Sequence, residues 1–314
     1  SIGIEDLAAN DIEAISFIYN IPLWLINLWI SEFGRDKTED LCAWFNEQPK
    51  LTARINTILI DIPQCLTMLN EQGWAVTQDS NYEDIIYINS HRGSLEKSEA
   101  FIKGYITFMD KASMLVARLV NPQPGERILD CCAAPGGKSM YMATLMDNVG
   151  SLMSCDIHEH KIELMNSNAD RLGASIVHTK VQDATKLPDS WNSYFDRVLV
   201  DAPCSGLGIL QKKLDMRWRK QESILRELPP LQLAILERAA MTVKEKGYLI
   251  YSTCTLNYKE NEAVVEAFLQ KHKEFSIIPV ADDFPLKSNS GMITTYPPTD
   301  DMDGFFMVKM QRIS

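Results

Sequence analysis

Apolar side chains near the start of the chain recur every three to four residues, the spacing that places them on one face of a helix. The positions that follow this spacing are Ile12, Ile15, Ile18, Trp24, Leu25, Leu28 and Trp29. We predict that residues 1–48 form a helical linker segment. The simplest role for such a segment is packing against the rest of the chain.

The pattern changes to short β-branched stretches after residue 48. Residues 51–56 and 85–88 have the composition of strands, and Asp61 begins a helical stretch between them. Short strands around a helix are typical of a small mixed module. We predict a small α+β module of the RNA-binding kind over residues 49–108.

Stretches typical of strands and helices alternate from there to the end of the chain. The predicted strands cover residues 127–132, 151–156, 176–181, 195–201 and 247–252. The predicted helices begin at Lys138 and cover residues 160–172, 228–245 and 261–272. This alternation indicates βαβ units and a parallel sheet, so we predict an α/β catalytic domain over residues 109–314. Such sheets bind ligands where their strands end.

The composition is that of a globular protein with a buried core. Of the 314 residues, 46% are apolar and 23% are charged, which suits a large domain with one or two small ones. The longest apolar run, residues 21–30, is far shorter than the roughly 20 residues of a membrane span. The start of the chain lacks the pattern of a signal peptide, so we expect a cytoplasmic protein without a membrane partner.

Charge and cysteine content narrow the choice of partners. The net charge of −11 requires any RNA contact to use a local basic patch. The seven cysteines include no C-x-x-C pair, so we expect reduced thiols and no zinc ribbon. His158 and His160 have no third ligand at a suitable spacing, and we predict no metal.

Acidic residues end successive predicted strands. The first strand ends at Asp130 and continues as Cys-Cys-Ala-Ala-Pro-Gly-Gly to Lys138, a turn whose small residues let the backbone approach a ligand. The turn is not G-x-G-x-x-G, which weakens a dinucleotide interpretation. Asp156 follows where an acid can accept hydrogen bonds from ribose hydroxyls. With Asp183 and Asp201 at the next strand ends, the pattern predicts a nucleoside pocket.

Two strand ends carry cysteines over the same predicted cleft. Cys204 lies in Asp-Ala-Pro-Cys-Ser-Gly and Cys254 in Tyr-Ser-Thr-Cys-Thr. A single such cysteine is usually a small buried apolar residue. Alkylation of carbon 5 of a pyrimidine, however, requires a thiolate to add first at carbon 6. A second acid or base then helps to resolve the adduct, and Cys204 is placed to provide it, while Asp201 could contact the cytosine amino group.

The segments that begin at Asp130, Asp201 and Tyr251 together resemble the RNA 5-methylcytosine methyltransferases. This family contains the Nop2/Sun group and the bacterial 16S ribosomal RNA cytosine-C5 methyltransferase B. The resemblance extends from Ile21 to Val308. It implies a Rossmann-like methyltransferase fold, S-adenosylmethionine as the cofactor and 16S ribosomal RNA as the substrate.

The resemblance also implies roles for individual residues. Cys254 matches the nucleophile, and Cys204 matches the cysteine that assists product release. The matching cofactor-binding positions are Cys132, Ala133, Ala134, Pro135, Gly136, Gly137, Lys138, Asp156, Asp183 and Asp201. Within the family the chain most resembles methyltransferase B, in which a helical NusB-like domain precedes helices like those of residues 1–45. We therefore expect that Ser1 starts a shortened or processed chain without that domain. Met109 stands where the family usually has glutamine.

A basic run follows the Cys204 motif. Its cations surround Trp218 and are Lys212, Lys213, Arg217, Arg219 and Lys220. Charge runs are usually solvated faces, but cations beside a stacking ring favour contact with RNA. We expect a monomer that binds RNA through this run and unstacks or flips the target base.

Other functions remain open at this point. A DNA cytosine-C5 methyltransferase would use Cys204 as its nucleophile, and its Glu-Asn-Val element is not found. An exocyclic-amine methyltransferase would carry an Asp/Asn-Pro-Pro-aromatic loop and would need no cysteine. The substrate could be another RNA such as tRNA. A non-catalytic RNA-binding assembly factor is a further alternative, against which the intact Cys254 counts.

Overall fold

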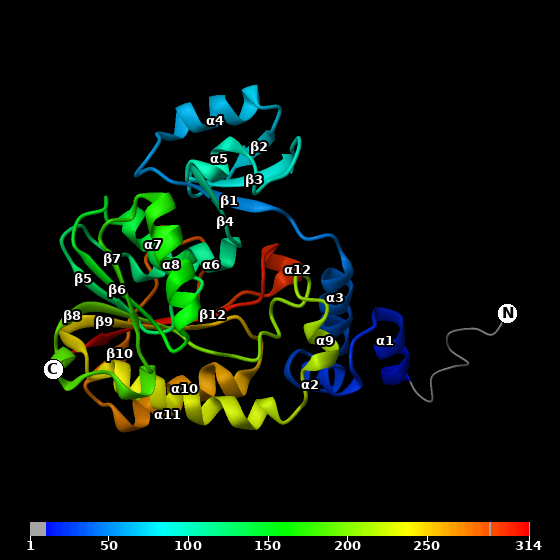
Figure 1. Ribbon diagram of the computed structural model, residues 1–314. Coiled ribbons are helices and arrows are strands. Elements are labelled where there is room, and N and C mark those ends of the chain that lie inside the picture. The colour runs from blue at the N-terminus through cyan, green and yellow to red at the C-terminus, as the bar shows by residue number, and fades with distance from the viewer. Residues whose placement is uncertain (1–10, 289, 314) are drawn as a thin grey trace.

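The computed structural model describes residues 11–288 and 290–313 of the chain. Its amino-terminal helices are α1 (Asp11–Tyr19), α2 (Leu23–Phe33) and α3 (Arg35–Asn46). They lie together beside the large domain in Figure 1. Trp29 of α2 and Phe45 of α3 stack with their ring centroids 5.5 Å apart. Helices thus fill most of the described part of the segment predicted as helical, whose residues 1–10 lie outside the description.

The apolar character of these helices is used for packing. In the described part of the chain no single helix is long and apolar enough to cross a membrane. The bent pair Ile12–Tyr19 and Leu23–Phe33 passes that test by length and composition, with an angle of 116° between its members. Leu25, Ile26 and Trp29 of α2 are nevertheless buried inside the protein.

A small α+β module follows the helices. Its elements are β1 (Thr52–Ile55), α4 (Ile62–Glu71), β2 (Ala75–Gln78), β3 (Ile85–Ser90), α5 (Glu99–Ile102) and β4 (Ile106–Phe108). The strands form an antiparallel sheet in the order β2-β3-β1-β4. Asp61 begins α4 by accepting a hydrogen bond from the amide of Gln64 at 2.9 Å. Ile55 and Leu69 belong to a hydrophobic core that the module forms for itself.

The large domain is built on one mainly parallel sheet. Its strands are β5 (Arg127–Asp130), β6 (Ser151–Asp156), β7 (Val177–Val181), β8 (Phe195–Asp201), β9 (Val243–Thr253), β10 (Phe275–Ile277), β11 (Met292–Thr294) and β12 (Phe306–Arg312). The order is β10-β12-β9-β8-β5-β6-β7, with β11 paired to β12, and the strands from β9 to β7 run parallel. The predicted α/β class is therefore confirmed.

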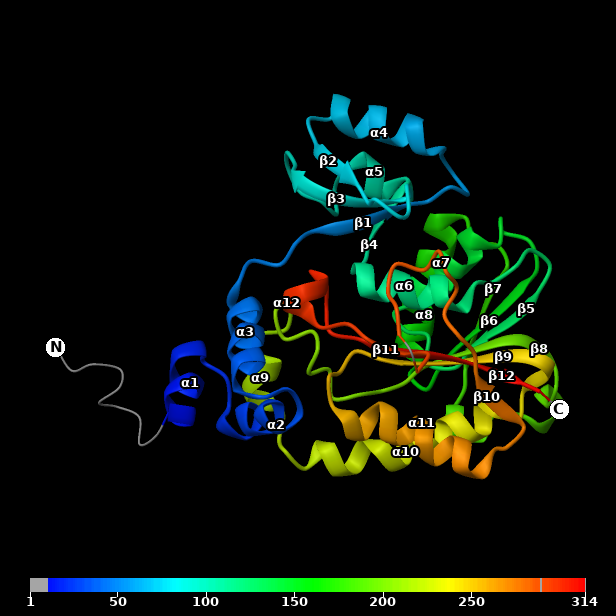
Figure 2. The same cartoon turned by 180° about the vertical axis from the view of Figure 1, so that it is seen from behind.

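Helices cover both faces of this sheet. The helices of this domain are α6 (Lys111–Val120), α7 (Gly137–Leu145), α8 (Glu159–Leu172), α9 (Met216–Arg219), α10 (Ile224–Ala240), α11 (Glu262–Lys271) and α12 (Pro297–Asp300), and its short 3-10 helices are η2 (Ala184–Lys186), η3 (Asp189–Trp191) and η4 (Tyr258–Glu260). Of these, α9 and α12 lie beside the amino-terminal helices. Figures 1 and 2 show α6, α7 and α8 on one face and α10 and α11 on the other. Each face has its own hydrophobic core.

The bounds predicted for the helix over residues 228–245 are wrong at both ends. The observed α10 begins at Ile224. The predicted start at residue 228 is too late because prolines are typical of a first helical turn, whereas Pro229 and Pro230 lie inside this helix. At the other end Thr242 donates its hydroxyl to the carbonyl of Ala239 at 2.7 Å, and the chain then enters β9. The remaining predicted strands and helices overlap the observed ones.

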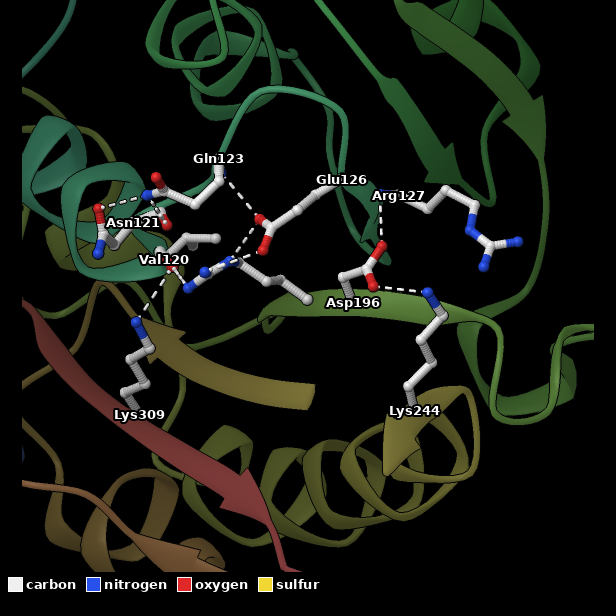
Figure 3. A network of polar contacts seen from close by, with 9 residues as sticks. Val120, Asn121, Gln123, Glu126, Arg127, Asp196, Lys244 and Lys309 are labelled. Atoms are coloured by element: carbon white, nitrogen blue, oxygen red, sulfur yellow. Dashed lines mark hydrogen bonds and ion pairs between the residues drawn. The ribbon is translucent and has the colours of Figure 1, made fainter. Parts of the chain in front are cut away.

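Ion pairs tie the amino-terminal ends of the central strands together, as Figure 3 shows. Arg197 Nε lies 2.6 Å from Glu126 Oε2, and Lys244 Nζ lies 2.6 Å from Asp196 Oδ1. Lys309 of β12 donates to the carbonyl of Val120 at 3.2 Å. Burial, reinforced by the nearby Arg197 charge, lowers the pKa of Lys309 to about 7. This end of the sheet therefore contains a lysine whose charged form is disfavoured by burial, as well as stabilising ion pairs.

Candidate active site

A cavity of about 460 Å³ opens at the carboxyl ends of the parallel strands. β5 and β8 are neighbours in the sheet although β6 and β7 separate them in the chain, so the cavity lies where the strand order reverses. The predicted site residues that line it are Cys132, Ala134, Asp156, Asp183, Asp201, Cys204 and Cys254. Further lining residues, which the sequence pattern does not single out, include Ile157, Gln182, Leu231 and Ile235.

The turn between β5 and α7 shapes one wall of the cavity. Ala133 donates its amide to the carbonyl of Cys155 at 2.7 Å, which ties the turn to β6. Gly136 has a φ of +98°, which favours glycine, and a Cβ there would lie 3.0 Å from Cγ of Met165. The predicted residues that belong to the turn or follow it, but do not line the cavity, are Ala133, Pro135, Gly136, Gly137 and Lys138.

Carboxylates at the ends of β6 and β7 suit a nucleoside ligand. Asp156 Oδ1 accepts a hydrogen bond from the amide of His158 at 3.0 Å and lies 3.7 Å from Lys161 Nζ. Asp183 accepts bonds from the hydroxyl and the amide of Thr185 at 2.7 and 2.9 Å, which lower the pKa of its carboxyl. Carboxylates can accept bonds from ribose hydroxyls or an adenine amino group. With the apolar walls, these residues fit S-adenosylmethionine.

Asp130 lies behind the cavity, which corrects the prediction that strand-end aspartates from four strands surround one pocket. Its exposed fraction is 1%, and its Oδ2 accepts a hydrogen bond from the hydroxyl of Ser139 in α7 at 2.7 Å. Ser154 of β6 donates in turn to the same hydroxyl at 2.8 Å. Burial raises the pKa of Asp130 to about 7. Its carboxylate therefore contacts α7 and does not line the cavity.

Lys138 and Asp201 form an ion pair close to Cys254. Lys138 Nζ lies 2.7 Å from Asp201 Oδ2, and the hydroxyl of Ser252 donates to Asp201 Oδ1 at 2.7 Å. Burial opposes the charge of Lys138, but Asp201 and the nearby Cys254 outweigh it and raise the lysine pKa above its ordinary value. The site therefore keeps a positive charge next to Cys254. Met109 packs nearby, since a Cβ on Gly137 would lie 3.6 Å from its sulfur.

Cys204 and Cys254 meet because their strands are paired. β8 and β9 run parallel with Asp201 opposite Ser252, and each strand leads into a loop that carries one cysteine. The two sulfur atoms lie 3.1 Å apart, and the amide of Cys254 lies 3.3 Å from Cys204 Sγ. The hydrogen bond with Cys254 and burial raise the pKa of Cys204 well above its ordinary value. Cys204 is therefore a neutral thiol beside Cys254.

A buried acid, Glu260, lies behind these loops and is not among the site residues predicted from the sequence. Glu260 has an exposed fraction of 0%, and its carboxylate accepts a hydrogen bond from the amide of Ser205, next to Cys204, at 2.8 Å. An acid at the start of a helix normally indicates an exposed cap. Its burial depends on segments distant in the sequence, which no local pattern reports.

The cations of the basic run after Cys204 differ in their surroundings, and the contact of this run with RNA stays a prediction. Lys212 Nζ lies 2.5 Å from Asp110 Oδ2 and 2.9 Å from Asp303 Oδ2. Arg217 is buried, where it donates to Asn46 Oδ1 at 2.7 Å. These two cations hold neighbouring segments. Among the cations of the run and Trp218, the exposed residues are Lys212, Lys213, Trp218 and Arg219, and Arg219 Nη1 lies 3.2 Å from Asp215 Oδ2.

The two histidines of the candidate metal motif lie side by side, with the ring centroids of His158 and His160 5.6 Å apart. Over the described ranges 11–288 and 290–313, no group of three or more His, Cys, Asp or Glu side chains is arranged to hold a metal ion.

The protein matches known methyltransferases along most of its length. The probable ribosomal RNA small subunit methyltransferase B of Bacillus subtilis is 37% identical over 297 residues, which are 93% of this chain and 66% of that protein. The chain therefore spans about two thirds of the length of this relative. Among solved structures, PH0851 superimposes with a TM-score of 0.90 at 32% identity, covering 96% of this chain and 68% of that one.

A further solved structure and two family models also match the chain. NSun6 from Pyrococcus horikoshii, solved with SFG, has a TM-score of 0.83 at 21% identity over 92% of this chain and 97% of that one, a likeness of fold. A family model for the ferredoxin-like domain of such methyltransferases matches residues 21–93. The model of the 16S rRNA methyltransferase RsmB/F family matches residues 117–311. Since that match covers more than half of the chain, the protein belongs to the 16S rRNA methyltransferase RsmB/F family.

Proposed function

We propose that this protein transfers a methyl group from S-adenosylmethionine to carbon 5 of a cytosine in 16S ribosomal RNA, through a covalent adduct with Cys254. The observation that carries the proposal is the pair of thiols at the ends of β8 and β9, with sulfur atoms 3.1 Å apart at the wall of the cavity. The family membership supports RNA methylation, and the names of the relatives support the small-subunit RNA.

The thiol pair and its neighbours account for the first half of the reaction. The Cys254 thiolate adds to carbon 6 of the cytosine, and the displaced electron pair makes carbon 5 nucleophilic. When bound, S-adenosylmethionine supplies the methyl group to carbon 5 from its sulfonium and leaves as S-adenosylhomocysteine. The Lys138 ammonium, which is paired with Asp201 at 2.7 Å, supplies positive charge near the attacking sulfur.

Cys204 is assigned to the second half of the reaction. The carbon-5 proton passes to water, the carbon 6–sulfur bond breaks, and its electron pair returns to the Cys254 sulfur. Cys204 donates a hydrogen bond from its S–H to that sulfur as it leaves and keeps its proton, in keeping with a pKa that its contact with Cys254 and its burial hold high. The products are 5-methylcytosine, a Cys254 thiolate and a neutral Cys204 thiol, which is the state from which the reaction began.

Two alanine variants test this assignment, because the mechanism gives them opposite phenotypes. Each variant is mixed with S-adenosylmethionine and naked small-subunit ribosomal RNA and then run on a denaturing gel. We expect Cys204→Ala to accumulate an RNase-sensitive protein–RNA adduct, since addition remains possible and release is impaired. We expect no adduct from Cys254→Ala. Cys65→Ala, a buried cysteine of α4 outside the cavity, is the control and should turn over without accumulation.

Other outcomes would lead to different conclusions. An adduct from Cys254→Ala alone would make Cys204 the nucleophile, as in a DNA-type enzyme. Full methyl transfer by Cys254→Ala would end the covalent mechanism. Mapping the labelled base distinguishes the substrates, because a methyl group that enters only tRNA would overturn the ribosomal assignment and leave the chemistry intact.

A further inference from the structure

Glu260 has a buried carboxylate that connects the two cysteine loops. It ends η4, immediately before α11. The carboxylate accepts hydrogen bonds from the amide and hydroxyl of Ser205 at 2.8 and 2.5 Å, from Gln232 Nε2 at 3.0 Å and from Asn257 Nδ2 at 2.9 Å. A buried carboxylate is strongly unfavourable without such donors. The segments that supply them are therefore held at fixed distances from Glu260.

Two of these donors fix the position of the backbone on both sides of Cys204. Ser205 follows Cys204 directly, and its hydroxyl also lies 2.8 Å from the hydroxyl of Thr255 in the opposite loop. Gln232 of α10 shares its amide group between Glu260 and the carbonyl of Pro203, which precedes Cys204, at 3.0 Å each. The residues before and after Cys204 thus depend on one carboxylate.

The next residue, Asn261, holds the other cysteine in a matching way. Thr253 donates its hydroxyl to Asn261 Oδ1 at 2.5 Å, and Asn261 Nδ2 donates to the carbonyl of Thr255 at 2.9 Å. Thr253 and Thr255 flank Cys254 in the sequence. Two consecutive residues, the last of η4 and the N-cap of α11, therefore hold different cysteines, Glu260 holding Cys204 and Asn261 holding Cys254.

We infer that Glu260 is a positioning residue that sets Cys204 against Cys254 for release of the product. It acts through Ser205 and Gln232 and needs no contact with the RNA. This inference rests on the proposed function, since release is the step assigned to Cys204. It predicts that a change at Glu260 copies the loss of the Cys204 thiol even though both cysteines are present.

The test is a single-turnover reaction of Glu260→Gln with labelled S-adenosylmethionine and small-subunit ribosomal RNA. The amide presents an N–H group where the carboxylate accepted donors, so Ser205 must move and carry Cys204 with it. We expect adduct to form at close to the wild-type rate and to be released roughly tenfold more slowly, the factor for one lost buried hydrogen bond. The adduct should therefore accumulate on a denaturing gel.

Two further variants separate positioning from general damage. Glu266→Gln makes the same change at an exposed position of α11 and should turn over like the wild type. Asn261→Ala should slow adduct formation without accumulation, because it loosens Cys254. If Glu260→Gln fails to fold, Ser205→Ala takes its place, since it removes one donor to Glu260 and should show the same accumulation to a smaller degree.

The Cys204→Ala protein separates a failure of the covalent mechanism from a failure of the positioning role of Glu260. If that protein forms no adduct, the proposed covalent mechanism fails whatever Glu260 does. If it accumulates adduct while folded Glu260→Gln resolves adduct at the wild-type rate, or loses formation and release in equal measure, the positioning role of Glu260 is wrong and the mechanism stands. Accumulation in both proteins, with normal behaviour of Glu266→Gln, supports the role.

Discussion

Individual side chains show what a strand pattern can and cannot predict. The pattern predicts Asp156 and Asp183 at the cofactor pocket because both follow strands, and the structure places both at the cavity. Asp130 also ends a strand, but its carboxylate faces Ser139 behind the cavity. A pattern locates a residue at the edge of a sheet, whereas the direction of its side chain depends on helix packing. Glu260 escapes prediction for the same physical reason.

Asp156 provides a prediction for cofactor binding. Its replacement by alanine removes an acceptor for ribose hydroxyls at the end of β6. We expect the affinity for S-adenosylhomocysteine to fall by about 1–3 kcal/mol, or roughly 5- to 150-fold, when such a group is lost. Titration calorimetry measures this change. Asp170→Ala, an exposed acid of α8, should bind like the wild type, and an unchanged affinity of Asp156→Ala would exclude Asp156 from the site.

At the scale of elements, alternation in the sequence predicts the parallel strands but not the antiparallel edge. β10 and β11 have three residues each, too few to show a period. β12 lies between β10 and β9 and brings Lys309 against Tyr248, with Nζ 4.6 Å from the ring centroid. Arg197 approaches the same ring at 4.7 Å. This contact of two cations with one ring depends on which strands are paired, and the pattern of residues within a single strand does not give that pairing.

Lys309 makes the stability of this edge depend on pH. Burial lowers its pKa to about 7 in the folded protein, whereas the unfolded chain has a lysine pKa of about 10.4. Between these values the folded state binds fewer protons, so the free energy of unfolding rises with pH. Relative to Lys309→Met, the wild type should gain at most about 1.4 kcal/mol per pH unit, and the gain should end near the unfolded pKa.

Thermal unfolding of both proteins at a series of pH values measures this gain. We expect Lys309→Met to be the more stable protein at neutral pH, because it buries no charge, and to lose that advantage as the pH increases. Lys287→Met, a change at an exposed lysine, should leave the pH dependence of the wild type unaltered. A stability difference that stays constant across the series would contradict a lowered pKa for Lys309.

At the scale of the whole molecule, distant segments support the cysteine loops. Leu207, which follows Cys204, and Leu256, which follows Cys254, share a hydrophobic core with Trp29 of α2. Periodicity predicts that the first helices exist and are amphipathic, but it does not identify what they pack against. Such contacts join residues far apart in the chain, so only the folded structure shows that the helical linker segment supports the site.

The negative net charge of the protein limits where RNA can bind. A protein with a net charge of −11 that binds RNA must rely on a few exposed cations. Lys213 and Arg219 are exposed near Trp218 in the segment after Cys204. Replacing both by alanine should weaken RNA binding and flatten its salt dependence by about 0.7–0.9 in log–log slope for each lost phosphate contact. Binding titrations at several salt concentrations measure the slope.

The control must change the net charge equally, because any loss of two cations weakens attraction to a polyanion. Lys246 and Lys273 are exposed and meet this requirement. Lys246 lies near the amino-terminal end of β9, and the residues on either side of Lys273 line a hollow with Ala240 and Met241, which precede β9. The double alanine variant of the two lysines should keep the wild-type slope, since a charge beyond about one Debye length from the RNA is screened. Equal slopes for all three proteins would show that the run after Cys204 is a solvated face and that the RNA lies elsewhere.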